Sequence, residues 1–456
     1  MAENEKTQSE GQLQATRTLE PVNQNQIQEA LDLLENEDGY QFIFNTVDDS
    51  EQLNPEQEAI KEIFLTEAEN KNERRKLKNR MQYWVNLLES ESNAGDMIEK
   101  SQSISSNAEQ NLNANLKKAL DATAVLESNY RAMADFFRNA GGDKPLKNVT
   151  FINASIEQTG DLDDPKVLET VSKELTDKYD RLDLMNNYGI IVIPGFIGNK
   201  AKLDEWARRA YDNKAMLVTD FRNLSSVDQV MKLWEQGKYT GGEAFRSNVL
   251  MSCNWLVGRE AVEEAGEKEP LFVPPSGALA GLIYSNNISQ VSAGKKFGAL
   301  RGALGSRFII RANDLSDLAD MGLVPTVFEY GQVQAMSSKT LFNGANIGLQ
   351  TYSVVRTFDW LTKAMIDYLN RMLFTNISVN LEMDVNKEIS RFLTKCQREY
   401  NIIENFGAVT VKRDPNQKDR VLVSANIKPY FPAKNFIIKL DGRAGDDGGE
   451  WNSSVE

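Results

Sequence analysis

A glycine and a lysine in the stretch SQVSAGKKF are the first residues of this chain that could do chemistry, because the stretch partly matches a phosphate-binding loop. Such a loop needs a glycine at its start, a Gly-Lys pair at its end and then a serine or threonine for Mg²⁺. Gly294 and Lys295 supply the pair, but Ser289 replaces the first glycine and Lys296 replaces the serine or threonine. A nucleotide-binding α/β enzyme that uses Lys295 is therefore kept only as an alternative interpretation.

Two other patterns have residue types that bind ligands. Gly195 and Gly198 lie in the stretch YGIIVIPGFIGNKAK, where an apolar strand pattern leads to a helical pattern, but two glycines alone do not make a dinucleotide-binding fingerprint. Asp314, Asp317 and Asp320 recur at helical spacing in ANDLSDLADMG, which is typical of a solvated helix face. Neither pattern predicts a catalytic or metal site.

Histidine is absent from the sequence. Its absence excludes Ser-His-Asp and Cys-His catalysis, histidine general bases and nearly all catalytic zinc sites. The two cysteines, Cys253 and Cys396, give no disulfide framework and are typical of a reducing compartment. We therefore predict that the protein is not an enzyme and has no catalytic residues, no cofactor and no metal.

The composition predicts a soluble globular protein of two or three domains, with 456 residues, 41% hydrophobic and 26% charged. A formal net charge of −14 disfavours nucleic acid and acidic membranes as partners. The longest apolar run, GIIVIPGF, is too short to span a bilayer, and the first twenty residues are too polar for a signal peptide. We expect a cytoplasmic protein without nucleic-acid binding or membrane insertion.

Residues 1–50 are predicted to form a flexible N-terminal arm. One apolar stripe at i, i+3, i+4 and i+7 predicts a short amphipathic helix within it. The stripe consists of Ile27, Ala30, Leu31 and Leu34. This helix either docks on its own domain or hooks into a groove of another protein. The stretch YQFIFNTV, with Phe42 and Phe44, is a candidate strand.

Beyond the arm, residues 51–145 predict a helical region and residues 146–330 predict an α/β domain. The stretches NVTFINAS, YGIIVIPGF, AMLVTDF and SNVLMSCNWLV predict strands that alternate with helices, so the fold class is an α/β layer with a mostly parallel sheet. Residues 331–440 predict a mixed α+β domain, and the Gly-rich acidic residues 441–456 predict a flexible tail.

The stretch LFVPPSGALAGLIY joins an apolar strand to a helix with almost bare sides. Pro274 and Pro275 fix φ and end the strand, and Ser276 is placed to cap the helix. Gly277 and Gly281 leave one helix face open to a closely packed backbone. That backbone belongs either to the core of the same subunit or to a neighbouring subunit.

The motif VPPSGALAGLIY resembles the Pro-x-Ser-Gly…Ala-Gly stretch of contractile tail sheath proteins. The order of three later segments is similar as well: YSVVRTFDWLTKAMIDYL, then ISRFLTKCQREYNIIENFGA, then strands ending in KPYFPAKNFIIKL. The resemblance covers about residues 185–440. Within this family the chain is most similar to the large sheath subunit of the type VI secretion system.

This resemblance implies a structural protein. The chain would pair with a small sheath subunit, and copies of the heterodimer would assemble on a baseplate into a helical tube around an inner tube protein. Contraction would drive the tube and its spike out of the cell. A sheath of another phage-tail-like contractile injection particle, which needs no small subunit, is the alternative within the same class.

The resemblance also implies roles for particular residues. The N-terminal stripe would be the helix that a recycling AAA+ unfoldase recognises. Neighbouring subunits would be joined by donated strands, and the C-terminal domain would supply the receiving sheet. The candidates for these inter-subunit strands are Phe42, Phe44, Val421, Val423, Phe436 and Ile438.

A basic ridge is predicted on the helical stretch 384–408. Lys387, Arg391, Lys395 and Arg398 are spaced by four, four and three residues, which places them on one face of a helix. An ordinary solvated face would show the same pattern. The resemblance implies a second interpretation, because in the sheath family a helix just before the last strands faces the inner tube.

Overall fold

The computed structural model describes residues 66–90, 93–141 and 148–433, the segments 438–444 and 449–455, and the single residues 59, 63, 64 and 146. The chain divides into two compact units, Met1–Lys118 and Ala119–Glu456. Several residues singled out above lie outside the described part. They are Ile27, Ala30, Leu31, Leu34, Phe42, Phe44 and Phe436.

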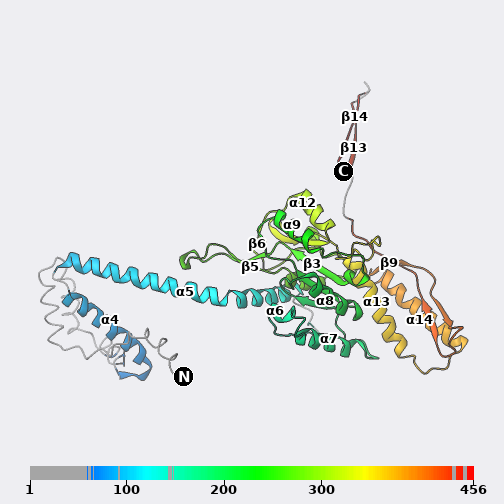
Figure 1. Cartoon of the computed structure of the whole chain (residues 1–456), viewed down its shortest axis with the longest axis horizontal. Helices are drawn as coiled ribbons and strands as arrows, with labels where there is room; N and C mark the ends of the chain where they lie inside the picture. The colour runs from blue at the N-terminus through cyan, green and yellow to red at the C-terminus, as the bar shows by residue number, and fades with distance from the viewer. Residues whose placement is uncertain are drawn as a thin grey trace. The chain divides into compact units, whose positions relative to one another are not determined.

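The first unit is helical in its described part, as the sequence predicts for this region (Figure 1). It contains the short 3-10 helix η2 (Ala68–Asn70), α4 (Lys71–Ser90) and the start of α5 (Ala94–Asn139). Asn93 caps α5, since its Oδ1 accepts the N–H of Asp96 at 2.9 Å. The 46 residues of α5 continue into the second unit.

A five-stranded sheet forms the centre of the second unit, in the order β1-β2-β3-β7-β8. The strands are β1 (Ile190–Ile193), β2 (Met216–Asp220), β3 (Val249–Cys253), β7 (Leu323–Glu329) and β8 (Gln332–Ala335). The pairs β1–β2, β2–β3 and β3–β7 are parallel, and β7–β8 is an antiparallel hairpin. The mostly parallel sheet is therefore confirmed. It extends to Ala335, slightly beyond the predicted boundary at residue 330.

Helices cover both faces of this sheet (Figure 1). Leu217 and Met251 point into one core layer with Trp206 of α8, whereas Val218 and Leu250 point into the other. The elements that contribute to the first layer are α7 (Lys166–Tyr179), α8 (Lys200–Asp212), α9 (Val227–Gly237), η3 (Ala244–Asn248) and α12 (Ala312–Asp320). Those of the second layer are α10 (Ser276–Ser285) and α13 (Tyr352–Asn370).

Smaller elements complete this α/β part. A three-stranded antiparallel sheet has the order β5-β4-β6, with β4 (Leu256–Arg259), β5 (Leu271–Val273) and β6 (Gly305–Ser306). The short helices are α6 (Ile156–Thr159), η4 (Glu263–Ala265) and α11 (Gly294–Phe297).

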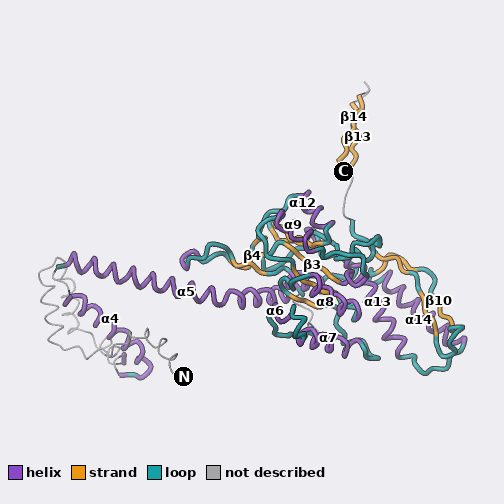
Figure 2. The backbone as a smooth tube through the Cα atoms, viewed as in Figure 1, coloured by secondary structure: helices purple, strands orange, loops and turns teal. Residues whose placement is uncertain are grey.

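Residues 148–155 do not form the strand that the stretch NVTFINAS predicts. In the structure they run without a sheet partner among the described residues and lead into α6 (Figure 2). Sequence pattern indicates the preference for an extended backbone, but a strand also needs a neighbour for its main-chain hydrogen bonds.

The C-terminal part mixes helices and hairpins, as predicted (Figure 2). The helix α14 (Val379–Arg398) is capped by Ser378, whose Oγ accepts the N–H of Leu381. Three antiparallel pairs follow: β9 (Ile403–Phe406) with β12 (Ile427–Pro429), β10 (Thr410–Arg413) with β11 (Val421–Ser424), and β13 (Ile438–Ala444) with β14 (Gly449–Val455). The last pair differs from the flexible tail predicted for residues 441–456.

Candidate assembly surfaces

The turn between β5 and α10 is held by a buried carboxylate. Asp220 stands at the end of β2 and is completely buried. Its Oδ1 accepts the Ser276 N–H at 2.8 Å and the Ser252 hydroxyl at 2.5 Å. Its Oδ2 accepts the Ser276 hydroxyl at 2.5 Å and the Gly195 N–H at 2.8 Å. Burial raises the pKa of Asp220 to about 6, although all four hydrogen bonds favour its ionised form.

Two predictions about this turn have different outcomes. The strand β5 ends at Val273, directly before Pro274 and Pro275, as predicted. The proposed capping role of Ser276 was wrong: it is the first residue of α10, and its hydroxyl binds Asp220 instead of a helix N–H. A cap is supplied by the residue before the first helical one, and Pro275, which has no side-chain acceptor, holds that position.

The bare face of α10 packs against α5. A Cβ on Gly277 would lie 2.1 Å from the Ala132 carbonyl oxygen, and a Cβ on Gly281 would lie 2.2 Å from that of Phe136. Of the two interpretations left open by the sequence, the structure therefore supports packing within one subunit. Residues before and after this contact also tie α5 to the body: Ser128 donates to the Phe272 carbonyl at 3.1 Å, and the Asn139 amide donates to the Arg301 carbonyl at 2.9 Å.

An ion-pair cluster reinforces the same attachment of α5. Arg259 of β4 lies 3.1 Å from Glu127 of α5 and 2.6 Å from Glu267. Hydrogen bonds from Arg259 lower the pKa of Glu267 to about 2. Arg131 of α5 pairs with Glu127 at 2.8 Å and donates to the Gly258 carbonyl at 3.1 Å.

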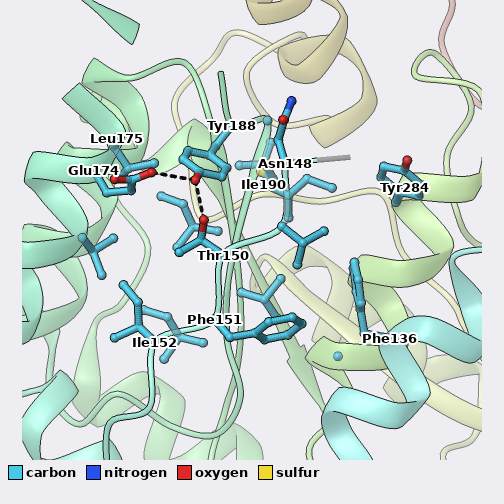
Figure 3. Close-up of a pocket in the computed structure, with 18 of the residues that line it drawn as sticks. Phe136, Asn148, Thr150, Phe151, Ile152, Glu174, Leu175, Tyr188, Ile190 and Tyr284 are labelled. Atoms are coloured by element: carbon cyan, nitrogen blue, oxygen red, sulfur yellow. Dashed lines mark hydrogen bonds between the residues drawn. The ribbon is translucent and has the colours of Figure 1, made fainter. Parts of the chain in front are cut away.

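A cavity of about 1180 Å³ lies beside β1 (Figure 3). Its walls come from α5, the segment 148–157, α7, the edge of β1 and α13. On one wall, the Tyr188 hydroxyl donates to Glu174 at 2.8 Å and lies 2.5 Å from the Thr150 hydroxyl (Figure 3). Most of the other lining side chains are apolar, and the polar groups on this wall bind one another.

The α13 wall carries four charged side chains, Arg356, Asp359, Lys363 and Asp367. Lys363 donates to the Asn187 side chain at 3.1 Å and to the Tyr188 carbonyl at 2.9 Å, and Asp359 accepts the Asn248 amide at 2.7 Å. Burial lowers the pKa of Lys363 to about 8. Burial also lowers the pKa of Arg356 to about 10, and its Nη1 has no hydrogen-bond partner among the described residues.

The basic ridge lies on the exposed face of α14. The side chains of Lys387, Arg391, Lys395 and Arg398 are all exposed. The opposite face is buried through Val385, Ile389, Leu393 and Cys396. Arg391 lies 3.7 Å from Glu388, a long and solvent-exposed ion pair. The predicted geometry of the ridge is thus present, and its role stays a prediction.

The candidate inter-subunit strands that fall in the described part lie in two-stranded sheets. Val421 and Val423 are half-buried on β11, which pairs only with β10 in that part of the chain. Ile438 begins β13 and pairs with Val455 of β14. Each two-stranded sheet leaves outer edges whose N–H and C=O groups can bind a further strand.

The residues considered for catalysis have structural contacts in the body. The Lys295 Nζ lies 4.6 Å from the Tyr330 ring centre in a cation–π contact. The Gly195 N–H donates to Asp220, and Asp314 accepts the Arg311 N–H at the start of α12.

In the described ranges, no group of three or more His, Cys, Asp or Glu side chains could hold a metal ion. Nor does that part of the chain contain a helix long and apolar enough to cross a membrane.

These features define a class of protein: an assembly subunit with an α/β body. Its described residues contain no recognisable catalytic centre, and its open strand edges and exposed helix faces suit assembly.

Three family models match the chain in succession. They are the TssC/VipB-like N-terminal region at residues 27–116, the type VI secretion system TssC/VipB central domain at 118–343, and the TssC/VipB-like C-terminal domain at 351–456. The chain belongs to the TssC/VipB family and is a contractile sheath subunit of the type VI secretion system.

Solved structures with a similar fold include other contractile sheaths. The contracted helical sheath of the anti-feeding prophage is 16% identical, with a TM-score of 0.48 over 68% of this chain and 80% of the other. The contracted PVC sheath complex of an extracellular contractile injection system is 16% identical, with a TM-score of 0.42 over 54% and 68%. A sheath tail protein from Desulfitobacterium hafniense is 13% identical, with a TM-score of 0.38 over 56% and 52%. No curated protein sequence matches the chain.

Proposed function

We propose that the chain is the larger half of a sheath heterodimer that works in the cytoplasm. With a smaller sheath subunit it forms a helical tube around an inner tube protein, built on a baseplate. Contraction of this tube drives the inner tube and spike out of the cell. The single observation that carries the proposal is the succession of N-terminal, central and C-terminal TssC/VipB matches from residue 27 to residue 456.

The proposed work of contraction needs no chemistry in the subunit. Energy is stored as the difference between two lattice packings of the same body, and the lattice changes from one to the other. A rigid body suits this role, and the doubly covered sheet, with β2 and β3 fully buried, provides one. We therefore expect no catalytic turnover from the chain itself.

Donated strands are the proposed connections between neighbouring copies. Added strands bind through main-chain hydrogen bonds, which can persist while the subunit bodies slide. Val421 and Val423 lie on β11, whose sheet has two strands among the described residues, and Ile438 lies on a second such sheet. The stretch with Phe42 and Phe44 is the proposed donor.

The ridge Lys387, Arg391, Lys395 and Arg398 is the proposed contact with the inner tube. Exposed ion pairs contribute only about 0–1 kcal/mol each, so many in parallel give a grip that contraction can release. The exposure of all four side chains on α14 supports this role. The N-terminal stripe that begins at Ile27 is the proposed attachment helix for the recycling unfoldase.

Electron microscopy of the co-expressed subunits tests the proposal. The full chain is produced with and without the smaller sheath subunit, under otherwise identical conditions. Long hollow tubes or cogwheel-like rings that appear only with the smaller subunit are expected. Tubes formed by this chain alone would favour a self-sufficient phage-type sheath, and a uniform small particle in both preparations would contradict a sheath.

A further inference from the structure

Three cations without a carboxylate partner lie near the turn between β7 and β8. Lys295, Lys296 and Arg301 have exposed side chains, and none of them forms an ion pair with another described residue. The Lys295 Nζ contacts the ring of Tyr330, which is itself 74% exposed. The acidic residue of this turn, Glu329, is exposed as well and pairs with none of the three cations. The surface therefore presents positive charge next to an exposed aromatic ring.

The main chain holds these cations together. Ala299 bridges Gln334 of β8 in antiparallel register, which brings Arg301 toward the β7–β8 turn. The Gln332 side chain donates to the Lys295 carbonyl at 3.2 Å and fixes α11 beside the same turn. We refer to the three cations as the basic patch. In a chain of net charge −14, such a patch attracts a negatively charged surface of matching shape.

The loop between β4 and β5 carries the opposite charge. Residues 260–269, which we call the acidic loop, contain five glutamates and one lysine. Two of the glutamates are neutralised, because Arg259 pairs with Glu267 at 2.6 Å and Arg307 lies 3.4 Å from Glu269. The other three are exposed and have no ion-pair partner among the described residues. They are Glu260, Glu263 and Glu264.

The two charged surfaces lie at different positions along α5. Arg259, which leads into the acidic loop, pairs with Glu127. Gly302, which follows the basic patch, lies against Asp135, whose Oδ1 would be 2.3 Å from an added Cβ. Glu127 and Asp135 are separated by about 12 Å of helix rise. Figure 2 shows the acidic loop extending outward from β4, past the central sheet. In the described part of one chain, no ion pair joins the loop to the patch.

We infer that the acidic loop of one copy of this chain docks on the basic patch of a second copy in the sheath. The inference rests on the sheath function proposed above and names the surfaces by which two copies recognise each other. The loop and the patch are different parts of one chain, so each copy offers its loop to one neighbour and its patch to another. Head-to-tail contacts of this kind generate helical assemblies when they do not close into a ring.

Charge complementarity favours a second copy as the occupant of the basic patch. Both members of the contact are present in every copy, so they occur in equal numbers throughout a tube. Three charge pairs for each contact set the register between copies, because a shifted arrangement would leave like charges opposite each other. The basic ridge of α14 matches the loop less well, since Glu388 lies 3.7 Å from Arg391 there.

Two charge-reversed chains test the contact. The patch variant carries Lys295→Glu, Lys296→Glu and Arg301→Glu, so that its patch is acidic like its loop. The loop variant carries Glu260→Lys, Glu263→Lys and Glu264→Lys, so that both of its surfaces are basic. Each variant, produced with the smaller sheath subunit, should give about tenfold fewer sedimentable tubes than the wild type, because like charges then face each other. All six side chains are exposed and unpaired, so each free variant should melt like the wild type.

Producing both variants in the same cell should restore the tubes, because each patch then meets a loop of opposite charge on the other variant. A chain with Lys173→Glu, Lys232→Glu and Lys238→Glu is the matched control. It reverses three exposed lysines that also have no ion-pair partner in the described ranges and lie outside the proposed contact, and it should assemble like the wild type.

Crosslinking identifies the occupant directly. In wild-type tubes, a zero-length carbodiimide reagent should join Glu263 or Glu264 to Lys295 or Lys296. Tubes assembled from a mixture of isotope-labelled and unlabelled chains should contain these crosslinks between a labelled and an unlabelled copy.

The outcomes distinguish this contact from the proposed function. If the wild type forms tubes but either variant alone assembles equally well, or the two variants together form no more tubes than each alone, the contact is wrong and the sheath function stands. Crosslinks from the acidic loop only to the smaller subunit, or only to the α14 ridge, would also overturn the contact. If the wild type forms no tubes with the smaller subunit, both proposals fail.

Discussion

Replacing Gly277 and Gly281 by alanine is expected to destabilise the protein strongly, against the usual effect of this change in a helix. Each new Cβ would lie 2.1 or 2.2 Å from a main-chain carbonyl oxygen of α5, at Ala132 and Phe136 respectively. Ordinary van der Waals contact begins near 3.4 Å, and a main-chain atom cannot rotate away as a side chain can. The two helices would therefore have to move apart.

The magnitude follows from two opposing terms. Overpacking a core costs about 1–3 kcal/mol for each site, and obstacles in the backbone favour the upper end. Alanine in place of glycine in a helix interior gains up to about 1 kcal/mol for each site. The net loss for Gly277→Ala with Gly281→Ala is therefore about 4 kcal/mol, a large part of the roughly 5–15 kcal/mol by which native proteins are stable.

Urea unfolding, followed by tryptophan fluorescence, measures this loss, because Trp206 and Trp234 are buried in the central core. The midpoint should fall by roughly 1 M or more for the double variant. Gly242→Ala is the control, since its Cβ would meet no atom within 4 Å, and its midpoint should not change. A double variant as stable as the wild type, or more stable, would refute the close packing of α10 on α5.

Three further changes have defined outcomes. Burial raises the pKa of Asp220 from 3.8 to about 6, so the folded chain binds the carboxyl proton more tightly than the unfolded chain does. The contribution of Asp220 to the free energy of unfolding should therefore fall by about 3 kcal/mol as the pH rises from roughly 4 to 6. That slope should disappear in Asp220→Asn, and pH-dependent unfolding that is the same in both proteins would contradict it. Changing Lys387, Arg391 and Lys395 together to Glu should permit sheath assembly but give sheaths that lack the inner tube or contract early in electron micrographs, and normal tube-filled sheaths would leave the ridge as a solvated face. Deleting residues 1–50 should abolish tubes while size-exclusion chromatography still shows a folded heterodimer, and normal tubes would rule out strand donation by the arm.

The sequence by itself determined the local elements. Pro274 and Pro275 end β5 because proline fixes φ and lacks the N–H that a strand needs. The helix α14 shows the buried and exposed faces predicted by the spacing of Ile389 and Lys387. The alternation of apolar strands and helices predicted the parallel sheet, and the order of motifs predicted the sheath family. All of these depend on residues that are neighbours in the chain.

Only the tertiary structure decided where these elements find their partners. Ser276 binds Asp220, which is 56 residues away, and as the first residue of α10 it does not stand at the capping position. The glycines of α10 accommodate a backbone that precedes them by more than a hundred residues. The strand-like segment at 148–155 has no strand partner within the part of the chain that the structure describes. Arg356 appears in the sequence as an ordinary helix residue, and only packing buries its Nη1 without a hydrogen-bond partner among the described residues. Secondary-structure preference is a property of contiguous residues, whereas hydrogen-bond partners, cavities and buried charges depend on which distant segments the fold brings together.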